Sequence, residues 1–195
     1  MSYLTGYYAI REIVAMNFLI YIESIDKSVF LNINQNIINP FFDIFFPSLR
    51  ELTYVFWILL IIYFFIRKER KLALLMVIGI SAGAAFIYPV KYFIDRARPY
   101  DQIESTRLLT SPESDPSFPS GHAELSFLTS TVVSKFHPEY SKYLYTFSSL
   151  IALSRVYVGV HFPMDIVGGV IIGIIIGRLI LVLEQRKGYI WKEKI

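Results

Sequence analysis

Three short polar segments, residues 91–99, 119–122 and 154–165, contain the side chains of this chain that could do chemistry. The third segment places Arg155, His161 and Asp165 at the junction between two apolar stretches. A permanent cation, an imidazole and a carboxylate are costly groups to hold beside a membrane. We therefore interpret the three segments as parts of one functional site.

The first candidate function of these segments is anion binding. Lys91, Arg98 and Arg155 are cations that we expect on one membrane side, and Lys91 and Arg98 share a helical face if the helix continues to Arg98. Converging cations favour a multivalent anion, and arginine donors match phosphate oxygens in pairs. Ser120 and Gly121 open a predicted helix, whose free N–H groups also favour an anion. The pattern predicts a phosphate site.

Two histidines could react with a phosphate bound there. Asp165 follows His161 by one helical turn, with Pro163 at a favourable first-turn position. The carboxylate could therefore accept from one imidazole nitrogen and leave the other as a nucleophile. His122 could act as the general acid. The hypothesis is a double displacement in which phospho-His161 forms, the alcohol leaves protonated by His122, and water hydrolyses the intermediate.

Composition places these segments in an integral membrane protein. The length of 195 residues suits a single domain, residues 1–195, and the apolar fraction of 54% exceeds that of ordinary soluble proteins. The chain has no cysteine, which excludes disulfides, thiol nucleophiles and thiolate metal sites. The N-terminal residues lack the pattern of a removable signal peptide, so we expect the first spans to direct insertion.

Apolar stretches predict an all-α, polytopic membrane bundle with six transmembrane helices, at residues 7–22, 52–66, 72–93, 121–136, 143–158 and 163–183. Arg11 and Glu12 interrupt the first stretch, which could instead lie in the membrane interface. Residues 23–47 combine turn formers with phenylalanines and suit an interfacial segment whose aromatic rings face lipid.

Small residues and a long loop complete the expected layout. Residues 79–85 are mostly small, and Gly169, Gly173 and Gly177 recur every fourth residue, which predicts close packing against neighbouring helices. The loop 95–119 contains prolines and charges that exclude a spanning helix. Loops of this length are often functional.

Basic residues predict the orientation. They cluster at 67–71, around 135–142 and at 186–194, and alternating spans put all three clusters on one side. The positive-inside rule makes that side cytoplasmic, together with the C-terminus. The loop 95–119 and the junction 155–163 then share the extracytoplasmic side. Six spans would put both termini in the cytoplasm, and five would put the N-terminus outside.

The polar segments read K-x6-RP, PSGH and SR-x5-H-x3-D, which resembles the three signature motifs of the type 2 phosphatidic acid phosphatase superfamily. The motifs cover residues 91–165. The resemblance implies a six-helix membrane bundle and metal-independent dephosphorylation without a cofactor. It implies a phosphate-binding set of Lys91, Arg98, Ser120, Gly121 and Arg155, with His122 as general acid and His161 as nucleophile supported by Asp165.

We expect a lipid phosphate or diphosphate phosphatase, whose partners are its lipid substrate and membrane lipids rather than nucleic acid. The resemblance implies polyprenyl (undecaprenyl-type) diphosphate, phosphatidylglycerophosphate or phosphatidate as substrate, and the short chain favours the first. One alternative is a lipid phosphotransferase, and another is a catalytically silent lipid-binding bundle. The related vanadium haloperoxidases are soluble proteins, so the apolar stretches argue against that activity.

The remaining charged residues are interpreted more simply. His137 is expected to be a solvated loop residue, and Asp95, Arg96 and Arg107 to be solvated loop charges. The carboxylates of the long loop have no metal-ligand spacing and are expected to be solvating charges, with gating as the alternative; they are Asp101, Glu104, Glu113 and Asp115.

Overall fold

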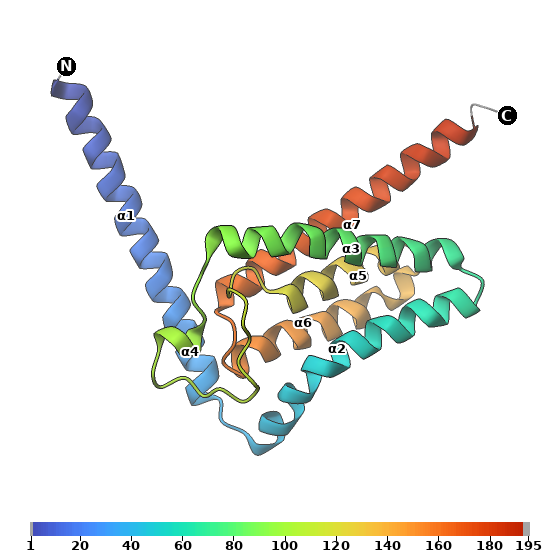
Figure 1. Cartoon of the computed structure of the whole chain (residues 1–195), viewed down its shortest axis with the longest axis horizontal. Coiled ribbons are helices and arrows are strands. Elements are labelled where there is room, and N and C mark those ends of the chain that lie inside the picture. Colours follow the sequence, from blue (N-terminus) through green and yellow to red (C-terminus); the bar gives the residue numbers. More distant parts are fainter. Residues whose placement is uncertain (1, 193–195) are drawn as a thin grey trace.

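The computed structural model describes residues 2–192, and every regular element within them is helical (Figure 1). The elements are α1 (Ser2–Leu31), η1 (Asn32–Asn36), α2 (Pro40–Ile66), α3 (Arg70–Ile94), α4 (Pro99–Gln102), α5 (Gly121–Phe136), η2 (Pro138–Tyr140), α6 (Ser141–Tyr157) and α7 (Pro163–Lys192). Helices α2, α3, α5, α6 and the first part of α7 form a bundle. The predicted all-α fold is confirmed.

Among the described residues, three segments are long and apolar enough to cross a membrane: Pro40–Ile66, Arg70–Gln102 and Pro163–Arg186. Their outward side chains include Ile44, Ile66 and Phe93, which are 78%, 72% and 90% exposed. A surface of this kind suits lipid rather than water. The number of helices that cross the membrane stays a prediction.

Helix α5 is the core of the bundle and packs against α7, α6 and α3. Glycines on α7 permit this approach, because a Cβ atom at Gly169 or Gly173 would collide with the backbone carbonyl of Ser120 or Glu124, respectively. The predicted close-packing face is therefore confirmed. It holds the start of α7 against the start of α5.

Helix α2 begins earlier than the sequence indicated, inside the segment 23–47 that was expected to lie at the interface. The Asn39 side chain accepts from the Phe41 N–H at 2.8 Å, and Pro40 occupies the first helical turn, so this start is well capped. Phe41 is 65% exposed, but Phe46 is buried with its ring centroid 4.8 Å from that of Tyr157. The expectation that these aromatic rings face lipid is therefore only partly right.

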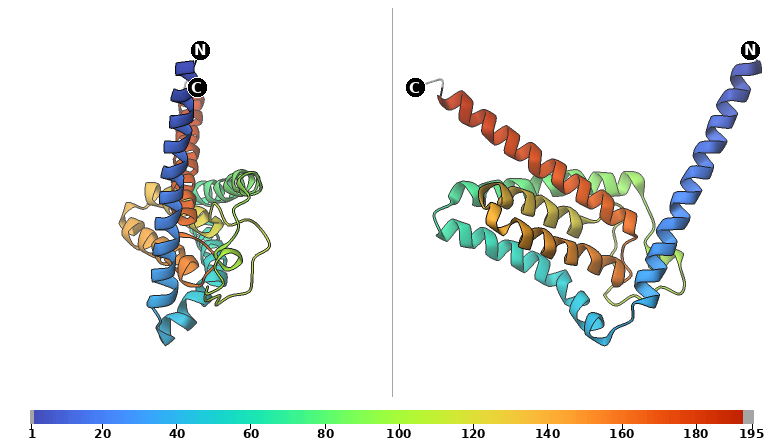
Figure 2. Two further views of the ribbon diagram at one scale, coloured as in Figure 1. Left: turned by 90° about the vertical axis from the view of Figure 1, so that its left-hand side faces the viewer. Right: turned by 180° about the vertical axis from the view of Figure 1, so that it is seen from behind.

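Helix α1 runs without a break through the region of Arg11 and Glu12 and leaves the bundle at a steep angle (Figure 2). Near its C-terminal end Asp26 anchors it, because its carboxylate accepts from the backbone N–H of Met164 at 2.8 Å. Just beyond α1, the buried Asn34 donates to the Tyr157 carbonyl at 2.8 Å. Whether residues 7–22 span the membrane stays a prediction.

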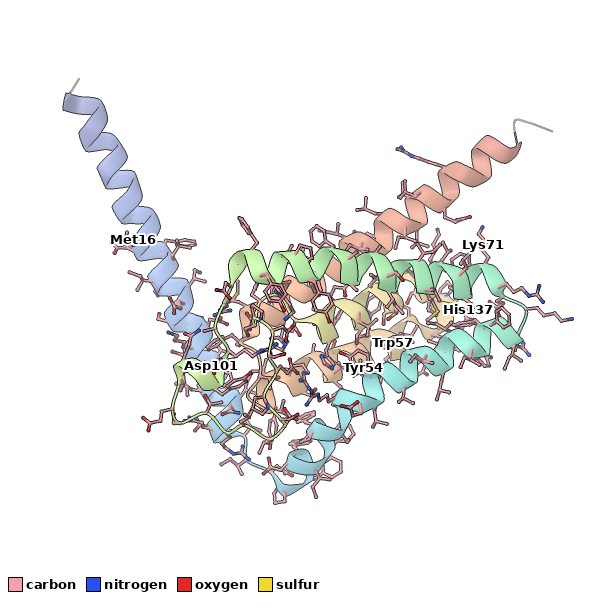
Figure 3. The ribbon with its side chains drawn as sticks, in the orientation of Figure 1. Met16, Tyr54, Trp57, Lys71, Asp101 and His137 are labelled. Carbon is pink, nitrogen blue, oxygen red and sulfur yellow. The ribbon has the colours of Figure 1, made fainter. Side chains whose placement is uncertain are left out.

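The bundle has two chemically different ends. We call one the motif end; it carries the loop 95–119 and the junction 158–162 between α6 and α7. We call the other the basic end; it carries the turn between α2 and α3, and Figure 3 shows Lys71 and His137 there, far from Asp101 of the long loop. The three polar segments thus share one end of the bundle, opposite the basic residues 67–71.

His137 at the basic end is not the solvated residue that the sequence suggested. Its ring nitrogens lie 2.7 Å from a carboxylate oxygen of Glu69 and 3.0 Å from one of Glu139. Its ring also stacks on that of Phe64. Burial lowers the pKa of His137, but the hydrogen bonds to the two carboxylates raise it more, so its pKa lies above the ordinary value.

Candidate active site

Three buried cations converge at the motif end. Lys91, Arg98 and Arg155 are 3%, 2% and 0% exposed. The Glu113 carboxylate bridges two of them, at 2.5 Å from Arg155 Nη2 and 2.8 Å from Arg98 Nη2. Asp115 lies 2.8 Å from Arg98 Nη2 and 3.0 Å from Lys91 Nζ. The interpretation of Glu113 and Asp115 as solvating charges is wrong, because buried cations need counter-charges.

Lys91 and Arg98 meet in a different way from the one predicted. Helix α3 ends at Ile94, and Asp95 adopts a left-handed conformation with φ of 48°, so Arg98 lies outside the helix. The two cations do not share a helical face. They come together because both contact Asp115, which the long loop folds back over them.

His161 is buried and presents its two nitrogens to different surroundings. Nδ1 lies 3.4 Å from Asp165 Oδ2. Nε2 faces the cation cluster, 3.5 Å from Arg98 Nη1 and 4.0 Å from Glu113 Oε2. This arrangement leaves Nε2 as the nitrogen that can meet an anion held by the cations.

Asp165 is itself held from several sides. Arg96 Nη1 donates to its Oδ1 at 2.6 Å, while the Ser117 hydroxyl and the Phe162 N–H donate to its Oδ2 at 2.5 and 2.8 Å. Arg96 also pairs with Asp26 on α1 at 2.6 Å. The interpretation of Arg96 as a solvated charge is therefore wrong, and sequence reasoning missed Ser117 and Asp26. An acidic residue within a largely apolar helix was the available signal for Asp26.

A tight turn brings His161 back beside the end of α6. The N–H of His161 donates to the carbonyl of Arg155 at 3.2 Å. Gly159 has φ of +89°, and a Cβ atom there would lie 2.5 Å from the Arg107 carbonyl oxygen, so the turn requires glycine. Arg107 donates to Asp43 at 2.8 Å and is not the solvated charge that was expected.

Several buried polar atoms around the cluster have no hydrogen-bond partner among the described residues. They are Ser120 Oγ, His122 Nε2, and Nε and Nη1 of Arg155. Buried polar atoms are nearly always paired, so donors left free at one place indicate a ligand. As predicted, α5 begins here at Gly121, and a Cβ atom on Gly121 would meet nothing within 4 Å. Gly121 at the start of α5 therefore lies beside open space.

Gly121, His122 and Lys91 line a pocket of about 540 Å³ between α2, α3 and α5. Its outer part is polar and contains His122, His161, Glu113 and Asp115. Its inner part, which lies further along α3 and α5 from the motif end, is mostly apolar, with Ile80, Ala84, Ile87 and Leu125. A volume of this size accepts a phosphorylated headgroup and the first atoms of a lipid chain.

One carboxylate in the inner part of the pocket has no obvious structural role. Glu124 is 4% exposed, and its Oε1 has no partner among the described residues. Gly83 on α3 makes room for it, because a Cβ atom there would collide with Glu124 Oε1. Glu124 was not predicted from the sequence, where its only signal is a charge close to the PSGH segment.

The charges of the loop and the junction are set by these contacts. Burial raises the pKa of Glu113, but attraction to Arg155 and Arg98 outweighs it, so the pKa lies below the ordinary value. The pKa of Asp115 is likewise lowered, because Lys91 and Arg98 outweigh the effect of burial. Burial lowers the pKa of His161 to about 4. At neutral pH the loop carboxylates are therefore charged and His161 is neutral.

Comparisons with known proteins agree with this geometry. A family model described as the PAP2 superfamily matches residues 70–189. The crystal structure of Aquifex aeolicus LpxE matches with a TM-score of 0.71 and 33% identity, over 79% of this chain and 93% of that chain. A transmembrane PAP2 type phosphatidylglycerolphosphate phosphatase from Bacillus subtilis matches with a TM-score of 0.67 and 25% identity, over 85% and 87% of the two chains.

A curated relative matches over a shorter part of its length. An undecaprenyl-diphosphatase of Sulfolobus acidocaldarius is 30% identical over 120 residues, which are 61% of this chain and 58% of that protein. The match thus spans little more than half of that relative. The family model covers more than half of this chain and contains all three polar segments. Built on this helical bundle, the chain is an integral membrane protein that belongs to the PAP2 superfamily.

Proposed function

We propose that the protein is a membrane lipid phosphate or diphosphate phosphatase that works through a phosphohistidine intermediate. One observation carries the proposal: His161 Nε2 faces buried cations and unpaired donors, while Asp165 holds the other ring nitrogen. An anion bound there lies against a neutral, oriented imidazole. That is the arrangement which nucleophilic catalysis needs.

The reaction follows from these positions. His161 Nε2 attacks phosphorus, the bond from phosphorus to the leaving oxygen breaks, and that oxygen takes a proton from His122. Water then attacks the phosphorus of phospho-His161 and gives a proton to the now neutral His122, which releases inorganic phosphate and free His161. Lys91, Arg98 and Arg155 stabilise the charge on the oxygens that stay with phosphorus throughout.

We infer that the motif end faces the extracytoplasmic side and that six helices span the membrane with a cytoplasmic C-terminus. The support is the basic turn at residues 67–71, which lies at the opposite end of the bundle from the site.

Cysteine labelling tests this orientation directly, because the chain has no cysteine of its own. In intact cells, Asp101→Cys in the exposed long loop should react with a membrane-impermeant maleimide. The control Lys68→Cys at the basic end should react only after the membrane is permeabilised. The reverse pattern would place the site in the cytoplasm.

As substrate we propose polyprenyl diphosphate of the undecaprenyl type. The undecaprenyl-diphosphatase relative and the apolar inner part of the pocket, which suits a hydrocarbon chain, support it. The second candidate is a lipid phosphate monoester, such as phosphatidylglycerophosphate or phosphatidate. The unpaired Glu124 carboxyl favours phosphatidylglycerophosphate, because its oxygen could accept from the free hydroxyl of the headgroup glycerol.

The test is phosphate release by the purified full chain in detergent with a metal chelator present. The panel is a polyprenyl diphosphate, the corresponding monophosphate, phosphatidylglycerophosphate and phosphatidate. We expect release that does not depend on added divalent metal and is fastest with the diphosphate. An added acceptor lipid that captures the phosphoryl group would indicate a transferase. No release and no transfer from any lipid would refute the proposal and leave a lipid-binding bundle.

A further inference from the structure

A fourth cation, Arg50, lines the same pocket as His122 and His161 but lies outside the three polar segments. It projects from α2, and its Nη1 donates to the Ser111 hydroxyl at 2.5 Å. Its ion pair among the described residues is a loose contact of 3.6 Å with Glu51, whose side chain is 80% exposed.

Arg50 differs in this respect from the three cations of the cluster. Lys91, Arg98 and Arg155 are almost fully buried, and each has Glu113 or Asp115 within 3.0 Å. The side chain of Arg50 is 28% exposed, and within the part of the chain that the structure describes no buried carboxylate pairs with it. Its guanidinium is therefore available to a ligand in the pocket at a small cost in desolvation.

Arg50 lies on the side of the pocket where the proposed reaction places the leaving group. Tyr54 lies one helical turn further along α2 (Figure 3). Its ring centroid is 5.0 Å from that of His122. His122 protonates the leaving oxygen in the proposed reaction, whereas His161 approaches phosphorus from the other side. The atoms attached to the leaving oxygen therefore extend from His122 toward α2, where Arg50 lies.

The chemistry of the leaving group decides what Arg50 meets. In a lipid monophosphate the leaving oxygen is bonded to carbon, which carries no charge. In a lipid diphosphate it is bonded to a second phosphorus, whose oxygens are negative and suit the paired donors of a guanidinium. We propose that Arg50 binds the inner phosphate of a lipid diphosphate and so makes the site prefer diphosphates over monophosphates. This inference rests on the proposed function.

The reaction with a diphosphate follows the same steps as with other lipid phosphates. The bond from His161 Nε2 to the outer phosphorus forms, and the bond from that phosphorus to the bridging oxygen breaks. The bridging oxygen takes the proton of His122 and leaves as part of the lipid monophosphate. Arg50 keeps its contact with the inner phosphate, so it is a substrate-binding residue for one substrate class only.

The experiment compares one polyprenol as its diphosphate and its monophosphate, with the full chain in detergent. Arg50→Ala should lower kcat/KM for the diphosphate about 10- to 100-fold, the range for loss of a charged hydrogen bond. For the monophosphate it should change kcat/KM by less than about threefold. Arg50→Lys should restore part of the loss, because it keeps the charge without the paired donors.

Two further variants separate binding from folding. Arg67→Ala, an exposed arginine at the basic end, should leave both substrates unaffected. Ser111→Ala removes the loop contact of Arg50 and should not change the ratio of the two kcat/KM values. An equal loss on both substrates in a folded Arg50→Ala protein would overturn the inference while leaving the phosphatase intact. An inactive wild type would refute the proposed function instead.

Discussion

Replacing His161 with alanine should reduce phosphate release by about four orders of magnitude or more, which is typical for loss of a nucleophile. The reason is positional: Nε2 is the nitrogen beside the buried cations, and Asp165 and Ser117 hold the other nitrogen. Without the imidazole, only direct attack by water remains. Steady-state phosphate release by the purified variant measures the effect.

His137, the histidine that lies outside the site, provides a matched control. His137 lies at the basic end, so His137→Ala should leave kcat/KM within about twofold of the wild type, as for most substitutions distant from a site. A rapid quench in alkaline detergent, with substrate radiolabelled in the transferred phosphate, adds a second measurement, because the P–N bond of phosphohistidine is stable in alkali and is cleaved in acid. Labelled protein should appear in the wild type and be absent in His161→Ala. Label that persists in this variant would move the nucleophile elsewhere.

Replacing Arg155 with alanine should lower kcat/KM about 10²- to 10³-fold, as for removal of one donor that stabilises transition-state charge. Arg155 is fully buried, its Nε and Nη1 have no partner among the described residues, and its Nη2 pairs with Glu113. We expect Arg155→Lys to recover only part of the activity, because lysine has no paired donors. Initial rates over a range of substrate concentrations measure both variants.

Misfolding is the competing explanation for a loss in Arg155→Ala, because Glu113 would lose one of its two cations. The double variant Arg155→Ala with Glu113→Gln removes that unbalanced charge. If the double variant is as inactive as Arg155→Ala, the missing contact is to substrate. Recovery of activity in the double variant would assign the loss to the carboxylate instead.

The parts of the site that could be predicted are those encoded by neighbours in sequence. Ser120 before Gly121 and Pro163 before Asp165 are local signals for a helix start, and both helices begin there. The contact between His161 and Asp165 depends only on one turn of chain. The glycines of α7 predicted close packing, because the absence of a side chain matters wherever the partner comes from.

The partners contributed by distant segments could not be predicted. Arg96 in the long loop pairs with Asp26 on α1, and nothing in the sequence around either residue identifies the other as its partner. The same holds for Glu113, whose contacts to Arg98 and Arg155 depend on the path of a loop with little regular structure. The presence of carboxylates near these cations could be predicted, since cations buried beside a membrane require counter-charges. Which carboxylates of the chain meet that requirement could not be predicted.

The Glu113 carboxylate of the long loop competes with phosphate for the same cations. Glu113 pairs with both Arg98 and Arg155. A phosphate that binds these donors must displace the carboxylate. Its binding free energy is therefore the difference between the attraction of the cations for phosphate and their attraction for Glu113. Because Glu113 is tethered, its effective concentration is high and does not fall with dilution. In the proposed reaction the same exchange favours release of inorganic phosphate, so the loop weakens the binding of product as well as that of substrate.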